Sequence, residues 1–312
     1  MKEKYQFERL IKKPWPFGNT LVRYGAVTLN QWEPGPIPYT SPDDVERYKK
    51  NVDFLVSRNI GDWRWLSEPI EYHYNNYNFR HPVDFDDDFD WSTKTVFLGC
   101  SYVEGCGNKY EETIPSYYGS LTGENIVNMG FNSASNDAIF YNALWLADKK
   151  PKKIIVLWTY YERFMHLHKM NVGENIYEDV THFTSAVLIG DDDSHIYNKF
   201  YTPERMLDNS HNRILKAINQ NALSAIFGDS IHFFDILDPE FFNLDAFTLL
   251  HTKDQLVKEL TDAGVPTMEI VNKVYARDIY DMDPPDINLY GGHMGPLVNE
   301  TVAKHIIDEI NR

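Results

Sequence analysis

Short apolar runs, each long enough for one strand, recur along the chain from residue 94 onward. They lack the strict alternation of a strand with one solvated face. Continuous apolar runs of this length are typical of strands buried on both faces of a parallel sheet. The pattern predicts five such strands, at Thr95–Leu98, Asn125–Met129, Ile154–Trp158, Ile231–Ile236 and Val265–Ile270.

Between the strands, apolar residues recur at helical spacing. Ile139 and Ala143 follow the capping residues Ser135 and Asn136, and residues 203–228 predict a helix before the fourth strand. A last helix carries the stripe Val298, Val302, Ile306 and Ile310. This alternation implies an α/β fold whose parallel sheet is covered on both faces, with its ligand site beyond the carboxyl ends of the strands.

The first part of the chain does not follow this alternation. It is rich in prolines and aromatic residues, and dense prolines leave room for few regular elements. We therefore expect an N-terminal accessory segment, residues 1–92, ahead of a main domain, residues 93–312. Its aromatic rings suit either a packed cover or a surface on which sugar rings stack.

One helix is predicted within the accessory segment, at about residues 42–58. Ser41 is suited to its N-cap, Pro42 to its first position, and Asp43 and Asp44 to its first turn.

Charge and composition exclude several classes of partner. The formal charge is −16, from 46 acidic and 30 basic residues, which disfavours nucleic acid and anionic membranes. No apolar run is long enough to span a membrane, and the charged N-terminus lacks a secretory signal. Only Cys100 and Cys106 are present, which is no disulfide framework. A cytoplasmic location is expected, and association with a virion stays open.

A serine follows the first predicted strand directly. Ser101 lies in the segment Gly99-Cys100-Ser101-Tyr102-Val103-Glu104-Gly105-Cys106-Gly107. This spacing matches neither Gly-x-Gly-x-x-Gly nor a Walker loop, and no lysine follows as that loop would need. A serine at a tight turn beyond a strand, with backbone N–H groups beside it, is typical of a nucleophile.

Four segments resemble the sequence blocks of SGNH (GDSL-type) hydrolases. Phe97–Gly107 resembles the first block, whose Gly-Asp-Ser signature often occurs as Gly-Cys-Ser. Asn76–Arg80 is similar to the Asn-x-x-Gly-Phe-Arg lead-in of many such enzymes, with Asn78 in place of the glycine. Val127–Gly130 is similar to the second block, and His293–Pro296 to the His-x-Gly-Pro form of the last one.

The resemblance covers residues 76–312 and implies a flavodoxin-like three-layer fold. It implies ester hydrolysis through an acyl-enzyme on Ser101, with His293 as the base and the N–H groups of Ser101 and Gly130 as oxyanion donors. It implies neither metal nor cofactor. The expected substrate is a small-molecule or carbohydrate ester.

The sequence departs from the family pattern at the carboxylate. The family usually has an aspartate three residues before the catalytic histidine, where this chain has Tyr290. A carboxylate is needed to fix the tautomer of the imidazole. Asp278 and Asp286 are candidate replacements of nearly equal rank, and Asp283 is a weaker third.

The second departure is in the third block, where the family has an asparagine after the third strand. This chain has Thr159-Tyr160-Tyr161-Glu162-Arg163 instead. Arg163 and Tyr160 are therefore expected to bind substrate, and Asn132 or Asn136 to supply the missing amide. If neither does, the loss of one oxyanion donor costs about 10²–10³ in rate.

Two functions of different classes remain open. The first is an esterase or deacetylase acting on an acylated carbohydrate or small ester. The second is a non-catalytic protein of the same fold that serves in binding or virion assembly.

Residues 165–203 are a longer segment than a plain strand–helix crossover needs, so they suit a lid over the site. No metal site is expected, because no cysteine or carboxylate joins the histidines at zinc spacing, at positions 166, 168, 182, 195 and 211.

Overall fold

The computed structural model describes residues 34–40, 43–132, 134–159, 168–172, 175–180, 210–235, 249–279 and 292–312. At its centre lies one sheet of four parallel strands in the order β4-β3-β5-β8. Numbered by their sequence along the chain, these four strands have the spatial order 2-1-3-4, with which flavodoxin-like sheets also begin. The strands are β3 (Lys94–Gly99), β4 (Asn125–Gly130), β5 (Lys153–Trp158) and β8 (Ile231–Asp235).

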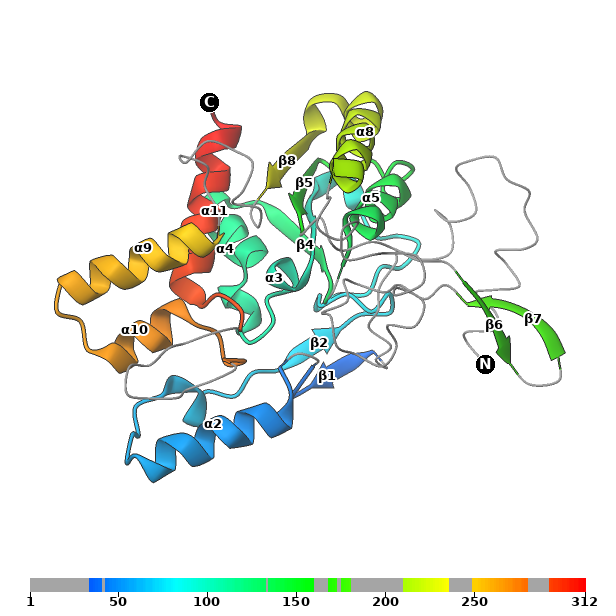
Figure 1. Cartoon of the computed structure of the whole chain (residues 1–312). Coiled ribbons are helices and arrows are strands. Elements are labelled where there is room, and N and C mark those ends of the chain that lie inside the picture. Colours follow the sequence, from blue (N-terminus) through cyan, green and yellow to red (C-terminus); the bar gives the residue numbers. More distant parts are fainter. Residues whose placement is uncertain are drawn as a thin grey trace.

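Helices cover both faces of this sheet (Figure 1). Helices α4 (Ile114–Thr122) and α11 (Pro296–Ile310) lie on one face, and α5 (Asn136–Trp145) and α8 (Ser210–Phe227) on the other. Strand residues such as Val96 are fully buried between them. The expected α/β fold with three layers is confirmed, and four of the five predicted strands are present.

The fifth predicted strand is wrong. Residues 265–270 lead into α10 (Thr267–Val274), which packs beside α9 (Leu249–Asp262). The buried residues of α10 are Ile270, Val271 and Val274, a spacing that places them on one helix face. The short apolar run concealed this helical spacing.

Helix α2 (Val45–Ser57) begins later than expected. Its N-cap is Asp44, whose carboxylate accepts the N–H of Arg47 at 2.8 Å. The predicted cap, Ser41, lies outside the described residues. Asp43 therefore precedes the helix, where it is buried and not part of the solvated first turn.

The remaining elements are short. Single 3-10 turns occur at Arg64–Leu66, Trp91–Thr93, Tyr110–Glu112 and Gly228–Ser230, and α3 covers Ser101–Glu104. Two antiparallel pairs are described: β1 (Gly35–Ile37) with β2 (Tyr72–Tyr74), and β6 (His168–Val172) with β7 (Asn175–Val180). The second pair lies in the predicted lid region, and the rest of residues 165–203 lies outside the described part. None of the described helices could cross a membrane by length and hydropathy.

Five aromatic residues in the described part of the N-terminal segment face inward. Trp63, Trp65, Tyr72, Tyr74 and Phe79 are each at most 2% exposed, and they belong to the same hydrophobic core as the sheet. These five rings form a packed cover and offer no stacking surface to a sugar. Trp15 and Trp32 lie outside the described residues. A domain boundary at residue 92 stays a prediction.

Candidate active site

Strand β3 delivers Ser101 to the carboxyl edge of the sheet. The strand ends at Gly99, Cys100 has extended backbone, and Ser101 is the first residue of α3 and only 3% exposed. The N–H groups of a first helical turn have no acceptor within their own helix. The backbone N–H of Ser101 is therefore suited to bind a developing oxyanion.

The loop after α3 is held from inside the protein by Arg80. Its fully buried guanidinium donates to the carbonyl oxygens of Glu104 at 3.2 Å, Gly105 at 2.6 Å and Asn108 at 2.7 Å. It also lies 4.2 Å from the centre of the Tyr72 ring, a cation–π contact. Arg80 thus satisfies three inward-facing carbonyls and fixes the path of the chain that follows Ser101.

His293 is placed by backbone pairing with the segment that follows α10. Tyr275 forms an antiparallel bridge with Met294, and the N–H of Ala276 donates to the carbonyl of His293 at 3.1 Å. This pairing brings Asp278 to His293, although 15 residues separate the two.

The carboxylate of Asp278 binds His293 at two points. Its Oδ2 lies 2.6 Å from Nδ1 of the ring, and its Oδ1 accepts the backbone N–H at 2.9 Å. Burial opposes the negative charge of Asp278, but the charge and hydrogen bonds of His293 together lower the pKa of the carboxyl below its ordinary value. With Nδ1 as the donor to this carboxylate, Nε2 is left as the acceptor of the ring.

The imidazole lies beside the start of α3. The centre of its ring is 4.8 Å from that of Tyr102, the residue after Ser101. Among the described residues, no hydrogen bond joins the Ser101 hydroxyl to the His293 ring. In ligand-free enzymes such bonds are often long and tighten only with substrate. Direct contact between the two side chains stays a prediction.

Asn108 lies in the loop between α3 and the turn at Tyr110, residues 105–109, which we call the serine loop. It links this loop to the segment that carries His293. Its Nδ2 donates to the carbonyl of Met294 at 2.9 Å and to that of Cys106 at 3.1 Å. Sequence reasoning missed this residue, because its partner lies 186 positions away and no motif marks it.

Gly130 allows β4 to approach α3 closely. A Cβ at this position would lie 2.4 Å from the backbone nitrogen of Glu104, so only glycine fits. Its N–H donates to Oδ1 of Asn128 at 2.9 Å, and Nδ2 of Asn128 donates to the carbonyl of Val103 at 2.9 Å. The N–H predicted as an oxyanion donor is therefore engaged within the fold.

Asn136 is engaged as well. Its Nδ2 donates to the carbonyl of Thr159 at 3.1 Å, and its Oδ1 accepts the N–H of Thr159 at 2.8 Å. These bonds connect the start of α5 to the end of β5, so the role of this amide is structural. An oxyanion role for Asn132 stays a prediction.

Several predicted residues lie outside the described part of the chain: Tyr160, Arg163, Asp283 and Asp286. Of the two leading carboxylate candidates, Asp278 is the one that the described structure brings to His293. Within the described residues, no group of three or more His, Cys, Asp or Glu side chains is arranged to hold a metal ion.

Comparison with known proteins adds little to this geometry. The chain matches no family model and no curated protein. Among solved structures, it is similar to a chain from Desulfitobacterium hafniense DCB-2 that is assigned to the G-D-S-L family of lipolytic proteins. The identity is 14% over 70% of this chain and 99% of that chain, with a TM-score of 0.30. That likeness carries no further argument.

Two more residues near the site were missed from the sequence. The sequence places Asp43 in the first turn of a helix and does not single out Arg277. Both are buried, with 1% and 4% of their surface exposed. Adjacency to a candidate carboxylate was the one available signal for Arg277.

Proposed function

We propose that the protein is a serine-dependent carboxylic-ester hydrolase. Ser101 is the nucleophile, His293 the general base and Asp278 the carboxylate that orients the base. One observation carries the proposal: a buried carboxylate takes both Nδ1 and the backbone N–H of a histidine whose ring lies beside the first turn of α3. This contact fixes one tautomer and one orientation of the imidazole, which is what general-base catalysis by histidine needs.

The reaction follows from these roles. Oγ of Ser101 attacks the acyl carbon while Nε2 of His293 takes the hydroxyl proton, and Asp278 stabilises the imidazolium that forms. The tetrahedral intermediate expels the alcohol, which receives the proton from His293. The acyl group stays on Ser101 until a water, deprotonated by the same histidine, attacks the acyl carbon. The bond to Oγ then breaks, the acid leaves, and His293 returns the proton to Oγ of Ser101.

The backbone N–H of Ser101 is the oxyanion donor in this proposal. Gly130 and Asn136 are not included, because their polar groups already have partners within the fold. The substrate class proposed is a carboxylic ester. A preference for carbohydrate esters is not part of the proposal, since the described aromatic rings that suggested it are buried.

Labelling with a fluorophosphonate tests the proposal. An activated serine forms a covalent adduct, so mass spectrometry is expected to find the label on Ser101. Ser101→Ala is expected to lose the label and to lower the hydrolysis of p-nitrophenyl acetate by about 10⁴-fold or more. Ser224→Ala, on an exposed position of α8, is the matched control and should behave as the parent.

An unlabelled Ser101 in folded protein, with no ester turnover, would overturn the proposal. The non-catalytic reading, a binding or assembly protein of the same fold, would then be the better one.

A further inference from the structure

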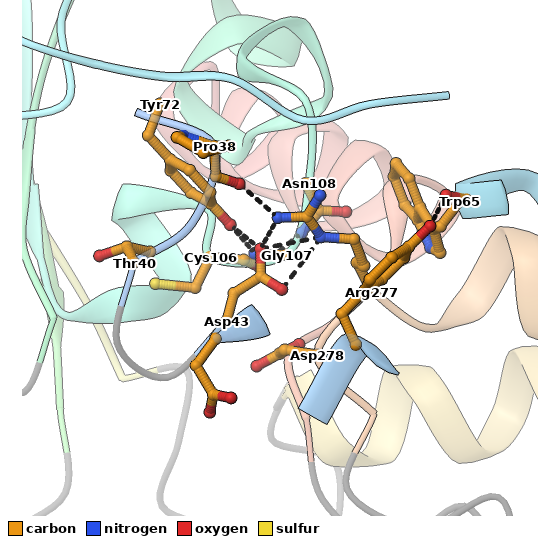
Figure 2. A network of polar contacts seen from close by, with 12 residues as sticks. Pro38, Thr40, Asp43, Trp65, Tyr72, Cys106, Gly107, Asn108, Arg277 and Asp278 are labelled. Carbon is orange, nitrogen blue, oxygen red and sulfur yellow. Dashed lines mark hydrogen bonds and ion pairs between the residues drawn. The ribbon is translucent and has the colours of Figure 1, made fainter. Parts of the chain in front are cut away.

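A buried ion pair outside the proposed triad joins two distant parts of the chain (Figure 2). Arg277 donates through Nη2 to Oδ2 of Asp43 at 2.7 Å and through Nε to both oxygens of Asp43 at 3.1 Å. Nη2 also donates to the carbonyl of Pro38 at 2.8 Å. The two residues are 234 positions apart, and removing two charges from water is costly unless the geometry compensates.

The pair is closed into a ring by the serine loop. The hydroxyl of Tyr72 donates to the carboxylate of Asp43 and accepts the N–H of Gly107 at 2.8 Å. The carbonyl of Gly107 accepts the backbone N–H of Arg277 at 2.8 Å. The ring therefore contains Asp43 and Tyr72 from the N-terminal segment, Gly107 from the serine loop, and Arg277 from the segment that carries Asp278.

The ring touches the catalytic carboxylate through Gly107. Its φ is +73°, and a Cβ at this position would lie 2.7 Å from Oδ1 of Asp278. Arg277 is bonded directly to Asp278 along the chain. The position of Asp278 is thus defined on one side by the backbone of Arg277 and on the other by the backbone of Gly107. The side chains of Asp43 and Tyr72 support both.

We propose that Asp43, Tyr72 and Arg277 form a buried clamp that positions Asp278 against His293, so that the N-terminal segment is part of the catalytic machinery. The inference rests on the proposed function and deepens it. None of the three residues is assigned contact with substrate, and they act through Asp278 as positioning residues.

Two physical effects make the clamp more than a stabilising contact. A small displacement of a catalytic group can cost about 10²-fold in rate, because the reacting atoms no longer meet in the productive geometry. In addition, removing the charge of Asp43 leaves Arg277 as an uncompensated cation beside Asp278. That cation competes with the His293 ring for the carboxylate of Asp278 and disfavours the imidazolium that forms during the proposed reaction.

Other groups contribute to the same field. The ring of Tyr102 faces His293, while Arg47 of α2, Asp43 and Cys106 interact electrostatically with Asp278. Arg47 and the thiol of Cys106 are unchanged in the variants below. A change in the hydrogen bond between Asp278 and His293 therefore reports on the clamp.

The test uses the full chain with Asp43→Asn and Tyr72→Phe. Asp43→Asn is expected to lower kcat about 10²-fold with KM within about twofold of the parent, because the clamp does not touch substrate. The NMR signal of the Nδ1–H proton of His293, assigned with a His293→Gln variant, should move, because the hydrogen bond of this proton to Asp278 weakens. The acidic limb of the pH profile of kcat/KM should move to lower pH, because the imidazolium is disfavoured. Tyr72→Phe keeps both charges and should lower kcat about tenfold with a smaller change in the NMR signal.

The matched control is Asp53→Asn. It removes a carboxylate from an exposed position of α2, outside the clamp, and should leave kcat and the NMR signal of His293 unchanged.

The outcomes separate the clamp from the proposed function. If the parent hydrolyses esters but both folded variants keep its kcat and its Nδ1–H signal for His293, the clamp is wrong and the triad stands. If Ser101 is never labelled, the proposed function fails, and the NMR signal alone decides the clamp. If Asp43→Asn does not fold, Tyr72→Phe decides it: parental kcat there would overturn the clamp.

Discussion

The two sides of the candidate site are built differently. On the acid–base side, which consists of Asp278 and His293, the two residues share two hydrogen bonds. On the oxyanion side, the polar groups of Gly130 and Asn136 are used by Asn128 and Thr159. The first side has the orientation that the proposed chemistry needs, while the described polar groups of the second side serve the fold.

This difference shows how a site should be assessed. A polar atom at the carboxyl edge of a sheet can bind an oxyanion or take a proton only if the fold has not already used it. Within the described part of the chain, the backbone N–H of Ser101 and Nε2 of His293 meet this condition. The amide of Asn136 and the N–H of Gly130 are at the right edge, but they already have partners.

The largest expected effect comes from breaking the acid–base side. Asp278→Asn keeps the shape of the side chain but takes away the charge that stabilises the imidazolium. We expect kcat for p-nitrophenyl acetate to fall by about 10⁴-fold while the protein stays folded. Circular dichroism and steady-state kinetics on the same samples measure both.

Asp286→Asn is the competing variant and should keep the parental rate. If Asp286→Asn were the slow variant and Asp278→Asn the fast one, the carboxylate would have been assigned to the wrong residue. Parental rates for both would point to a histidine oriented without a carboxylate.

The sheet was predictable because its strands are continuous apolar runs of the length that a buried parallel strand needs. The run at 265–270 failed because six residues are too few to separate a strand from the first turns of a buried helix. The placement of Ser101 just beyond β3 was predictable for another reason: a serine that follows an apolar run lies at the carboxyl edge of a parallel sheet. The catalytic roles of Ser101 and His293 stay predictions.

The choice between Asp278 and Asp286 could not be made from the sequence. Distance along the chain favoured Asp286, but the contact with Asp278 depends on the bridge between Tyr275 and Met294. Asp43 was less accessible still, because its partner Arg277 is brought to it only by the tertiary fold.

A smaller effect is expected from breaking the oxyanion side at Asn136. Asn136→Ala removes both hydrogen bonds between Asn136 and the backbone of the buried Thr159, which should lower the free energy of unfolding by about 2 kcal/mol. The kcat per folded molecule should stay within about threefold of the parent, because the fold uses this amide. Denaturant unfolding and active-site titration measure the two quantities.

Asn221→Ala, at an exposed position of α8, is the control for Asn136→Ala. The opposite pattern, unchanged stability with a kcat reduced by about 10²–10³, would restore Asn136 as an oxyanion donor.

The smallest expected effect is a pH dependence of stability that comes from His81, the neighbour of Arg80. His81 follows Arg80, is 6% exposed, and has Nδ1 3.0 Å from the hydroxyl of Tyr110. Burial, with smaller contributions from the charges of Lys94 and His73, lowers the pKa of His81 from 6.5 to about 4. Between these values the unfolded chain binds a proton that the folded protein does not, so stability falls as the pH falls.

The contribution of His81 is therefore complete above pH 6.5 and is lost as the pH falls toward 4. From pH 7 to pH 5, the parent should lose about 1–2 kcal/mol more stability than His81→Asn, which cannot take up the proton. Thermal melts at both pH values measure the difference, and His73→Asn, at an exposed position, should retain the parental dependence. Equal acid sensitivity in the parent and His81→Asn would mean that this histidine does not titrate below its ordinary range.

The loss of stability in acid on the acid–base side would then come from Asp278. Its carboxyl stabilises the fold above its unfolded pKa, near 3.8, and loses that contribution as the pH falls through its still lower folded pKa. The two origins are distinguished by where the loss begins, near pH 6.5 for His81 and below about pH 4 for Asp278.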